Sequence, residues 1–228
     1  MTPSRPRALI FDWDNTLVDT WTVIHHALTK TFRAMGEEPW TLEETRQRVR
    51  RSAREAFPEI FGTRAPEASR IFYETYEADH LALLRPLEGA EELLLGLSRC
   101  DDLYRAVLSN KAGHLLRREV MHLGWELHFD QVVGANDAKR DKPARDALDL
   151  ALEQSALEAG PDVWVIGDTD IDMACAVDHG CLGLLVRPEP PGKGEFSDSE
   201  PHGHVRDCRE LKRLLARSGL ALSNLHQP

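Results

Sequence analysis

The sequence predicts an α/β protein: a doubly wound parallel sheet that carries a small inserted α-helical domain. Two observations lead to this fold class. Four short apolar runs bounded by polar residues alternate with helical periodicity, as the buried strands of a parallel sheet do. A gap of about ninety residues separates the first two runs, whereas a crossover between parallel strands needs only about a dozen.

The four strands are expected where the apolar runs occur, at residues 8–11, 104–108, 163–166 and 182–186. Each run is too short for a helix and ends at polar residues. The stretch 188–204 is rich in proline, glycine and acidic residues, so we expect a long exposed loop there.

The long gap between the first two strands has a helical pattern. Apolar residues from Trp21 to Met35 recur at three- and four-residue spacing, and Gly36 follows as a stop signal. Thr41 and Glu44 form a capping box that begins a second helix.

A third helix of this region is expected to open at Pro66 and to end before Pro86, because proline is favoured in the first turn. We therefore place a helical domain at residues 18–87. The α/β domain would consist of residues 1–17 and 88–228.

Composition and charge narrow the class of protein. The 228 residues carry a formal net charge of −10, which argues against a nucleic-acid partner because such proteins present a basic surface. The four cysteines form no C-x-x-C pair, and reduced cytoplasmic thiols explain them best. No apolar stretch approaches the length of a membrane span or a signal peptide. We expect a cytoplasmic monomer or homodimer with no membrane partner.

Polar side chains directly follow three of the predicted strands. In open parallel sheets, ligands bind outside the carboxyl ends of the strands, so these side chains should converge. They are Asp12 and Asp14, Ser109 and Asn110, and Asp168 and Asp172.

The converging residue types point to phosphoryl transfer. Three carboxylates, those of Asp12, Asp14 and Asp168, cannot all stay ionised at close range without a cation. Mg²⁺ is a hard ion that prefers such oxygen ligands. The Ser109 hydroxyl and the charge of Lys142 would suit a phosphate group.

Four segments, in this order, resemble the four motifs of the haloacid dehalogenase superfamily. They read FDWDNTLVDT (11–20), VLSNK (107–111), DKPARDALDLAL (141–152) and GDTDIDMACA (167–176). Within that superfamily the chain is similar to the phosphoglycolate-phosphatase-like branch, in which a helical cap is inserted between the first and second motifs. The resemblance implies a Rossmann-like core and a phosphatase that acts with Mg²⁺.

The resemblance also implies a role for each acid. Asp12 would be the nucleophile that forms an aspartyl-phosphate, and Asp14 would protonate the leaving oxygen and then deprotonate the attacking water. The metal would be held by the Asp12 carboxylate, the Asp14 carbonyl and Asp168. Asp172 would orient a metal-bound water from the outer shell.

Ser109, Asn110 and Lys142 match the residues that hold the phosphoryl oxygens in the family. Trp13 and Asn15 depart from the family pattern, since many relatives have glycine at the latter position. Asparagine tolerates left-handed backbone geometry, so we expect the turn to survive.

The second helix of the inserted region leaves two interpretations open. Arg46, Arg50 and Arg54 would form a stripe on it, which usually means a solvated face. Alternatively, the segment RRSAREAF (50–57) resembles the specificity segment of the cap. Arg51 and Ser52 would then contact the leaving group, and the substrate would carry a second anionic or hydroxyl group.

The sequence therefore predicts a Mg²⁺-dependent phosphatase of a small phosphorylated metabolite, such as phosphoglycolate or a sugar phosphate. A phosphomutase of the same fold is the nearest alternative. A phospho-receiver or a non-catalytic interaction protein is a further alternative, although receivers have no helical insert.

Overall fold

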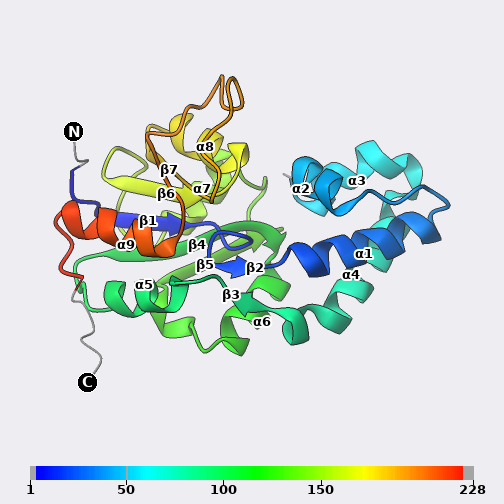
Figure 1. The fold of residues 1–228 in the computed structure, drawn as a ribbon, viewed down its shortest axis with the longest axis horizontal. Helices are drawn as coiled ribbons and strands as arrows, with labels where there is room; N and C mark the ends of the chain where they lie inside the picture. Colours follow the sequence, from blue (N-terminus) through cyan, green and yellow to red (C-terminus); the bar gives the residue numbers. More distant parts are fainter. Residues whose placement is uncertain (1–3, 50, 223–228) are drawn as a thin grey trace.

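The computed structural model describes residues 4–49 and 51–222, and its centre is a six-stranded parallel sheet (Figure 1). The strands lie side by side in the order β5, β4, β1, β6, β7, β8, and every neighbouring pair is parallel. Their bounds are β1 Ala8–Phe11, β4 Tyr104–Ala112, β5 Gln131–Ala135, β6 Val163–Gly167, β7 Leu182–Val186 and β8 Gly203–Val205. The predicted parallel α/β architecture is confirmed.

Helices cover both faces of the sheet because successive side chains of a buried strand point in opposite directions. Leu9 and Phe11 of β1 pack with α5, α6 and α9, whereas Ala8 and Ile10 pack with α7 and α8. The helices are α5 Ala90–Leu97, α6 Gly113–His122, α7 Arg145–Leu152, α8 Asp170–Val177 and α9 Cys208–Arg217, with a short turn of 3₁₀ helix at Glu126–His128. None of the helices in the described residues is both long and apolar enough to cross a bilayer.

The prediction of a long exposed loop over residues 188–204 is partly wrong. Gly203 and His204 belong to the edge strand β8, which pairs with β7. Phe196 in the middle of the stretch is buried against Met173 and Leu185. An aromatic side chain within a polar segment thus anchors the loop to the sheet, because burying it removes a large apolar surface from water.

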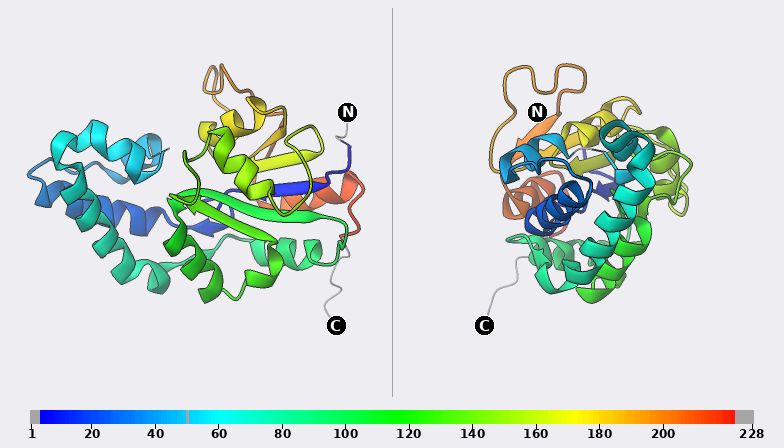
Figure 2. Two further views of the ribbon diagram at one scale, coloured as in Figure 1. Left: turned by 180° about the vertical axis from the view of Figure 1, so that it is seen from behind. Right: turned by 90° about the vertical axis from the view of Figure 1, so that its right-hand side faces the viewer.

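Between β1 and β4 lies the helical insertion, which we define as residues 21–83. Its elements are α1 Trp21–Ala34, α2 Leu42–Arg48, α3 Ala53–Phe61, a 3₁₀ turn Gly62–Arg64 and α4 Ala65–Leu83. The chain enters and leaves it through two short antiparallel strands, β2 Val18–Asp19 and β3 Arg85–Pro86. Figure 1 and the left view of Figure 2 place the insertion beyond the carboxyl ends of the strands.

The local signals of the insertion are largely confirmed. Gly36 follows α1 in a left-handed conformation with φ +75°. Thr41 and Glu44 form the expected capping box at the start of α2, and Pro66 lies in the first turn of α4.

The expected arginine stripe on one helix is wrong, because α2 ends at Arg48 and α3 begins only at Ala53. Arg46 and Arg54 therefore lie on different helices, and Arg50 lies outside the described residues. The helix α2 ends here because Val49 has an extended backbone (φ −79°, ψ 101°). On α3, Arg54 Nε donates to Asp141 of the α/β domain at 3.1 Å.

A buried carboxylate, that of Glu119 on α6, joins the helical insertion to the α/β domain. Its oxygens accept hydrogen bonds from Trp13 Nε1 at 2.7 Å, Lys111 Nζ at 2.5 Å and the Tyr76 hydroxyl at 3.1 Å. His80 Nδ1 lies 2.7 Å away. Burial alone would raise the pKa of Glu119, but the charge of Lys111 and these hydrogen bonds outweigh it and lower the pKa to about 2.

We expect Glu119→Ala to lower the free energy of unfolding by about 3–5 kcal/mol, because removing one partner of a buried ion pair leaves Lys111 poorly compensated. Glu77→Ala is the matched control. Glu77 also joins α4 to α6, through His114 and Arg118, but its side chain is 41% exposed. Its loss should cost less than about 1 kcal/mol. Urea denaturation measures both variants, and equal losses would contradict the assigned role of Glu119.

Candidate active site

Three carboxylates gather at the carboxyl edge of the sheet. Asp12 follows β1, and Asp168 and Asp172 follow β6. One oxygen from each lies within 4.8 Å of the others. Gly167 makes this approach possible, since a Cβ there would lie 2.1 Å from Cγ of Asp172. Thr169 orients the carboxylate of Asp172. Its backbone N–H donates to Asp172 Oδ2 at 3.0 Å, and its hydroxyl donates to the same atom at 2.8 Å.

Lys142 bridges two acids of this cluster, Asp12 and Asp172. Its ammonium donates to Asp12 Oδ1 at 2.7 Å, Asp172 Oδ1 at 2.5 Å and the carbonyl oxygen of Leu108 at 3.0 Å. These contacts use the three donors that a lysine has. Burial lowers the pKa of Lys142, but the charges of Asp12 and Asp172 outweigh it and raise the pKa above its usual value.

One lysine does not compensate all of the acids around Asp12. Burial, together with the charges of Asp172 and Asp14, raises the pKa of Asp12 to about 7 against the opposing effect of Lys142. A carboxyl group with so high a pKa marks a place where further positive charge would be stabilised. The three carboxylate oxygens are hard donors, so the residues fit a hard divalent cation such as Mg²⁺.

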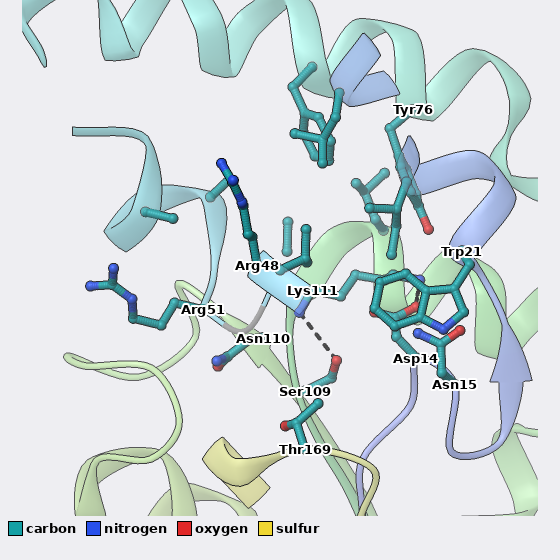
Figure 3. Close-up of a pocket in the computed structure, with 18 of the residues that line it drawn as sticks. Asp14, Asn15, Trp21, Arg48, Arg51, Tyr76, Ser109, Asn110, Lys111 and Thr169 are labelled. Carbon is teal, nitrogen blue, oxygen red and sulfur yellow. Dashed lines mark hydrogen bonds and ion pairs between the residues drawn. The ribbon is translucent and has the colours of Figure 1, made fainter. Parts of the chain in front are cut away.

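Asp14 lies beside the cluster and contacts a second buried lysine. Lys111 Nζ lies 2.6 Å from Asp14 Oδ1 and 2.5 Å from Glu119 Oε2. Asp14, Lys111 and Trp21, which begins α1, line the same cavity (Figure 3). The turn that carries Asp14 continues into Asn15, whose φ of 60° confirms the expected left-handed geometry.

The predicted phosphate-binding residues face the same cavity as the acids. The Ser109 hydroxyl accepts a hydrogen bond from the backbone N–H of Lys111 at 3.2 Å (Figure 3). Asn110 Nδ2 donates to the carbonyl oxygen of Lys142 at 3.0 Å. Its Oδ1 atom is buried and has no hydrogen-bond partner within the described part of the chain. The fold thus brings Ser109, Asn110 and Lys142 to Asp12.

Arg51 and Ser52 belong to the insertion, where they directly precede α3, and each has a protein partner. Arg51 lines the cavity and donates to both oxygens of Glu59, at 2.7 Å and 2.5 Å. The Ser52 hydroxyl donates to Asp141 at 2.6 Å, and the guanidinium of Arg54 binds the same carboxylate. A role for Arg51 and Ser52 in substrate selection stays a prediction.

Sequence reasoning assigned no role to Lys111 or Glu119. Lys111 stands in the motif VLSNK, but nothing in the sequence shows that β4 runs on to Ala112 and turns the ammonium toward Asp14. Glu119 did leave a signal. It occupies the apolar face of α6 with Leu115 and Val120, where an acidic residue requires a buried partner.

Comparison with known proteins agrees with the residues gathered here. A sequence model of the family "haloacid dehalogenase-like hydrolase" matches residues 9–186. A phosphoglycolate phosphatase of Cereibacter sphaeroides is 29% identical over 224 residues, which cover 91% of this chain and 99% of the relative. An N-acetylmuramic acid 6-phosphate phosphatase of Pseudomonas aeruginosa is 29% identical over 189 residues, with coverage of 80% and 82%.

Solved structures show the same fold. The crystal structure of a predicted phosphatase from Clostridium acetobutylicum superposes with a TM-score of 0.82 at 20% identity, covering 94% of this chain and all of the other. The family match spans well over half of the chain and reaches from β1 to β7, which includes Asp12 and the strands on either side of it. The protein therefore belongs to the haloacid dehalogenase-like hydrolases and is a phosphatase that resembles the phosphoglycolate phosphatases among them.

Proposed function

We propose that this phosphatase hydrolyses small phosphate monoesters with the help of Mg²⁺, through an aspartyl-phosphate on Asp12. The observation that carries the proposal is the position of Asp12: a buried carboxylate in an oxygen cluster with Asp168 and Asp172, 2.7 Å from the ammonium of Lys142. The curated relatives are named for phosphoglycolate and for N-acetylmuramic acid 6-phosphate, which supports a small phosphorylated metabolite as the substrate.

Hydrolysis would proceed in two displacements at phosphorus. An oxygen of Asp12 bonds to phosphorus while the bond to the ester oxygen breaks, and Asp14 gives that oxygen its proton. Asp14 then takes a proton from water as the water oxygen attacks phosphorus, which frees Asp12 and inorganic phosphate. Ser109 and Asn110 hold the phosphoryl oxygens in both steps. Lys142 is the third residue assigned to them, and it would exchange one of its three present contacts for a phosphoryl oxygen.

The carboxylates of Asp12 and Asp168, with the carbonyl of Asp14, are the residues we assign to Mg²⁺. When bound, the ion supplies positive charge that offsets the charge on the transferring group. Asp172 suits an outer position, because one of its oxygens binds Lys142 and the other binds Thr169.

We further propose that residues 18–87 act as a cap domain over a core of residues 1–17 and 88–228. The β2 and β3 pair supports this division, since it holds together the two places where the chain passes between the two parts. A cytoplasmic location is supported by the four cysteines, all of which are buried and free.

Replacing the nucleophile should abolish turnover without unfolding the protein. We expect Asp12→Asn to release no phosphate from acetyl phosphate, because an amide cannot form the acyl phosphate. Asp170→Asn is the matched control, an exposed acid on the first turn of α8, and it should keep wild-type activity. Hydrolysis by well-folded Asp12→Asn at the wild-type rate would overturn the assignment.

Removing the acid and base should slow the reaction by a smaller factor. We expect Asp14→Asn to lower kcat by ~10²- to 10⁴-fold, the typical contribution of such a group. Steady-state phosphate release measures the effect, and circular dichroism checks the fold. A kcat within threefold of wild type would exclude Asp14 from proton transfer.

Stabilisation by Mg²⁺ should depend on pH in a direction set by Asp12. Its raised pKa, about 7, means that the ion-free protein loses stability as the pH rises from near 4 toward 7, where folding holds a proton that the unfolded chain releases. Mg²⁺ must displace that proton. We expect Mg²⁺ to raise Tm more at pH 8 than at pH 5.5, relative to EDTA. An equal rise at both pH values would show that Asp12 does not ligate the ion.

A further inference from the structure

A cavity of about 150 Å³ lies between the helical insertion and the carboxylate cluster. Most of its wall is apolar and comes from three helices of the insertion. The apolar residues include Trp21, Ile24 and Leu28 of α1, Phe57 and Ile60 of α3, and Phe72 of α4.

This cavity is continuous with the reaction centre, because Asp12, Asp14 and Ser109 also line it. Trp21 of α1 and Tyr76 of α4 line the same cavity from the insertion (Figure 3). A phosphoryl group placed at Asp12 and Ser109 would therefore direct its leaving group toward the apolar wall.

The cations around the cavity have carboxylate partners. Among the described lining residues, Arg48 contacts Glu44 at 3.2 Å and its guanidinium lies 5.1 Å from the centre of the Trp40 ring. Arg51 is paired with both oxygens of Glu59, and Figure 3 shows its guanidinium pointing away from Ser109.

Each of the two buried lysines is also paired with carboxylates. Lys111 lies between Asp14 and Glu119, and Lys142 lies between Asp12 and Asp172. A second anion on the leaving group would lose its hydration in an apolar cavity and would face Asp14 without a cation of its own.

An uncharged apolar leaving group has no charge to dehydrate and is not repelled by Asp14. It would exchange water for aromatic and aliphatic contacts on the side that faces the insertion. One ring is of the right order for this space, since an apolar protein cavity of about 150 Å³ accepts a molecule such as benzene.

We infer that the preferred substrate is a phosphate monoester whose leaving group carries one uncharged apolar ring, bound against Trp21, Phe57 and Phe72. This inference rests on the proposed function and narrows its substrate class. It departs from phosphoglycolate, whose leaving group carries a carboxylate.

Substrate competition tests the inference with wild-type enzyme and Mg²⁺. Benzyl phosphate, phosphoglycolate and glycerol phosphate are compared, and acetyl phosphate reports on the chemistry alone. We expect kcat/KM for benzyl phosphate to exceed that for each of the other two monoesters by at least about tenfold, since even one methylene in an apolar pocket is worth about that much.

A binding measurement makes the test independent of turnover. Titration calorimetry with Mg²⁺ compares benzylphosphonate with methylphosphonate, which share the charged group and differ in the ring. We expect Kd for benzylphosphonate to be lower by at least about tenfold.

A pair of variants locates the ring in the cavity. Ala56 on α3 lines the cavity, whereas Ala78 on α4 is exposed and lies outside it. We expect Ala56→Trp to fill the cavity and to raise Kd for benzylphosphonate by at least about tenfold, and Ala78→Trp to leave it unchanged. If Ala56→Trp does not fold, the wild-type comparisons still decide.

The possible failures are distinguishable. Hydrolysis of phosphoglycolate or glycerol phosphate as efficiently as benzyl phosphate, or equal Kd values for the two phosphonates, would overturn the inference and leave the proposed function standing. If neither the esters nor acetyl phosphate were hydrolysed, the proposed function would fail. The Kd values of the two phosphonates would still show whether the cavity binds an apolar ring.

Discussion

The contact of Lys142 with Asp12 and Asp172 is the interaction on which the site depends. It brings together the ends of two neighbouring parallel strands, β1 and β6, whose acids would otherwise repel one another in a buried place. The parallel sheet makes the convergence possible, and the buried ammonium makes it stable. The excess of carboxylate that remains, visible in the raised pKa of Asp12, is what suits the cluster to a divalent cation.

A second buried lysine also balances two acids, and it connects the site to the helical insertion. Lys111 joins Asp14 to Glu119, and Glu119 in turn holds Tyr76 and His80 of α4. The expected acid and base is therefore connected, through one buried carboxylate, to the helix that walls the cavity. Because both lysines are used to balance acids, little positive charge is left for the leaving group, and the apolar wall dominates its surroundings.

Much of this arrangement could be predicted from the sequence, because short-range patterns specify it. The run 8–11 is apolar throughout and became a strand buried on both faces, and Asp12 follows it at the expected edge. The contact of Arg54 with Asp141 could not be predicted, because the two residues are distant in the sequence. The network of Glu119 was missed for the same reason: its partners come from several elements.

The strands β5 and β8 were also missed. Gln131–Ala135 is short and contains a glycine, and Gly203–Val205 has a single large apolar residue, so neither carries a strong pattern. Each of these two strands is stabilised by pairing with a neighbour, β5 with β4 and β8 with β7. Sequence patterns thus located the residues that carry the proposed chemistry, and the tertiary contacts that hold them and shape the cavity emerged only in the folded chain.

The most direct test of the account is to trap the covalent intermediate. The enzyme is mixed with acetyl phosphate and Mg²⁺, quenched during turnover, and treated with borohydride, which reduces an acyl phosphate of aspartate to homoserine. Peptide mass spectrometry should find homoserine at position 12 and unmodified aspartate at position 14. Reduction at Asp14 or Asp168 instead, with Asp12 intact, would contradict the assignment of Asp12 as the residue that attacks phosphorus.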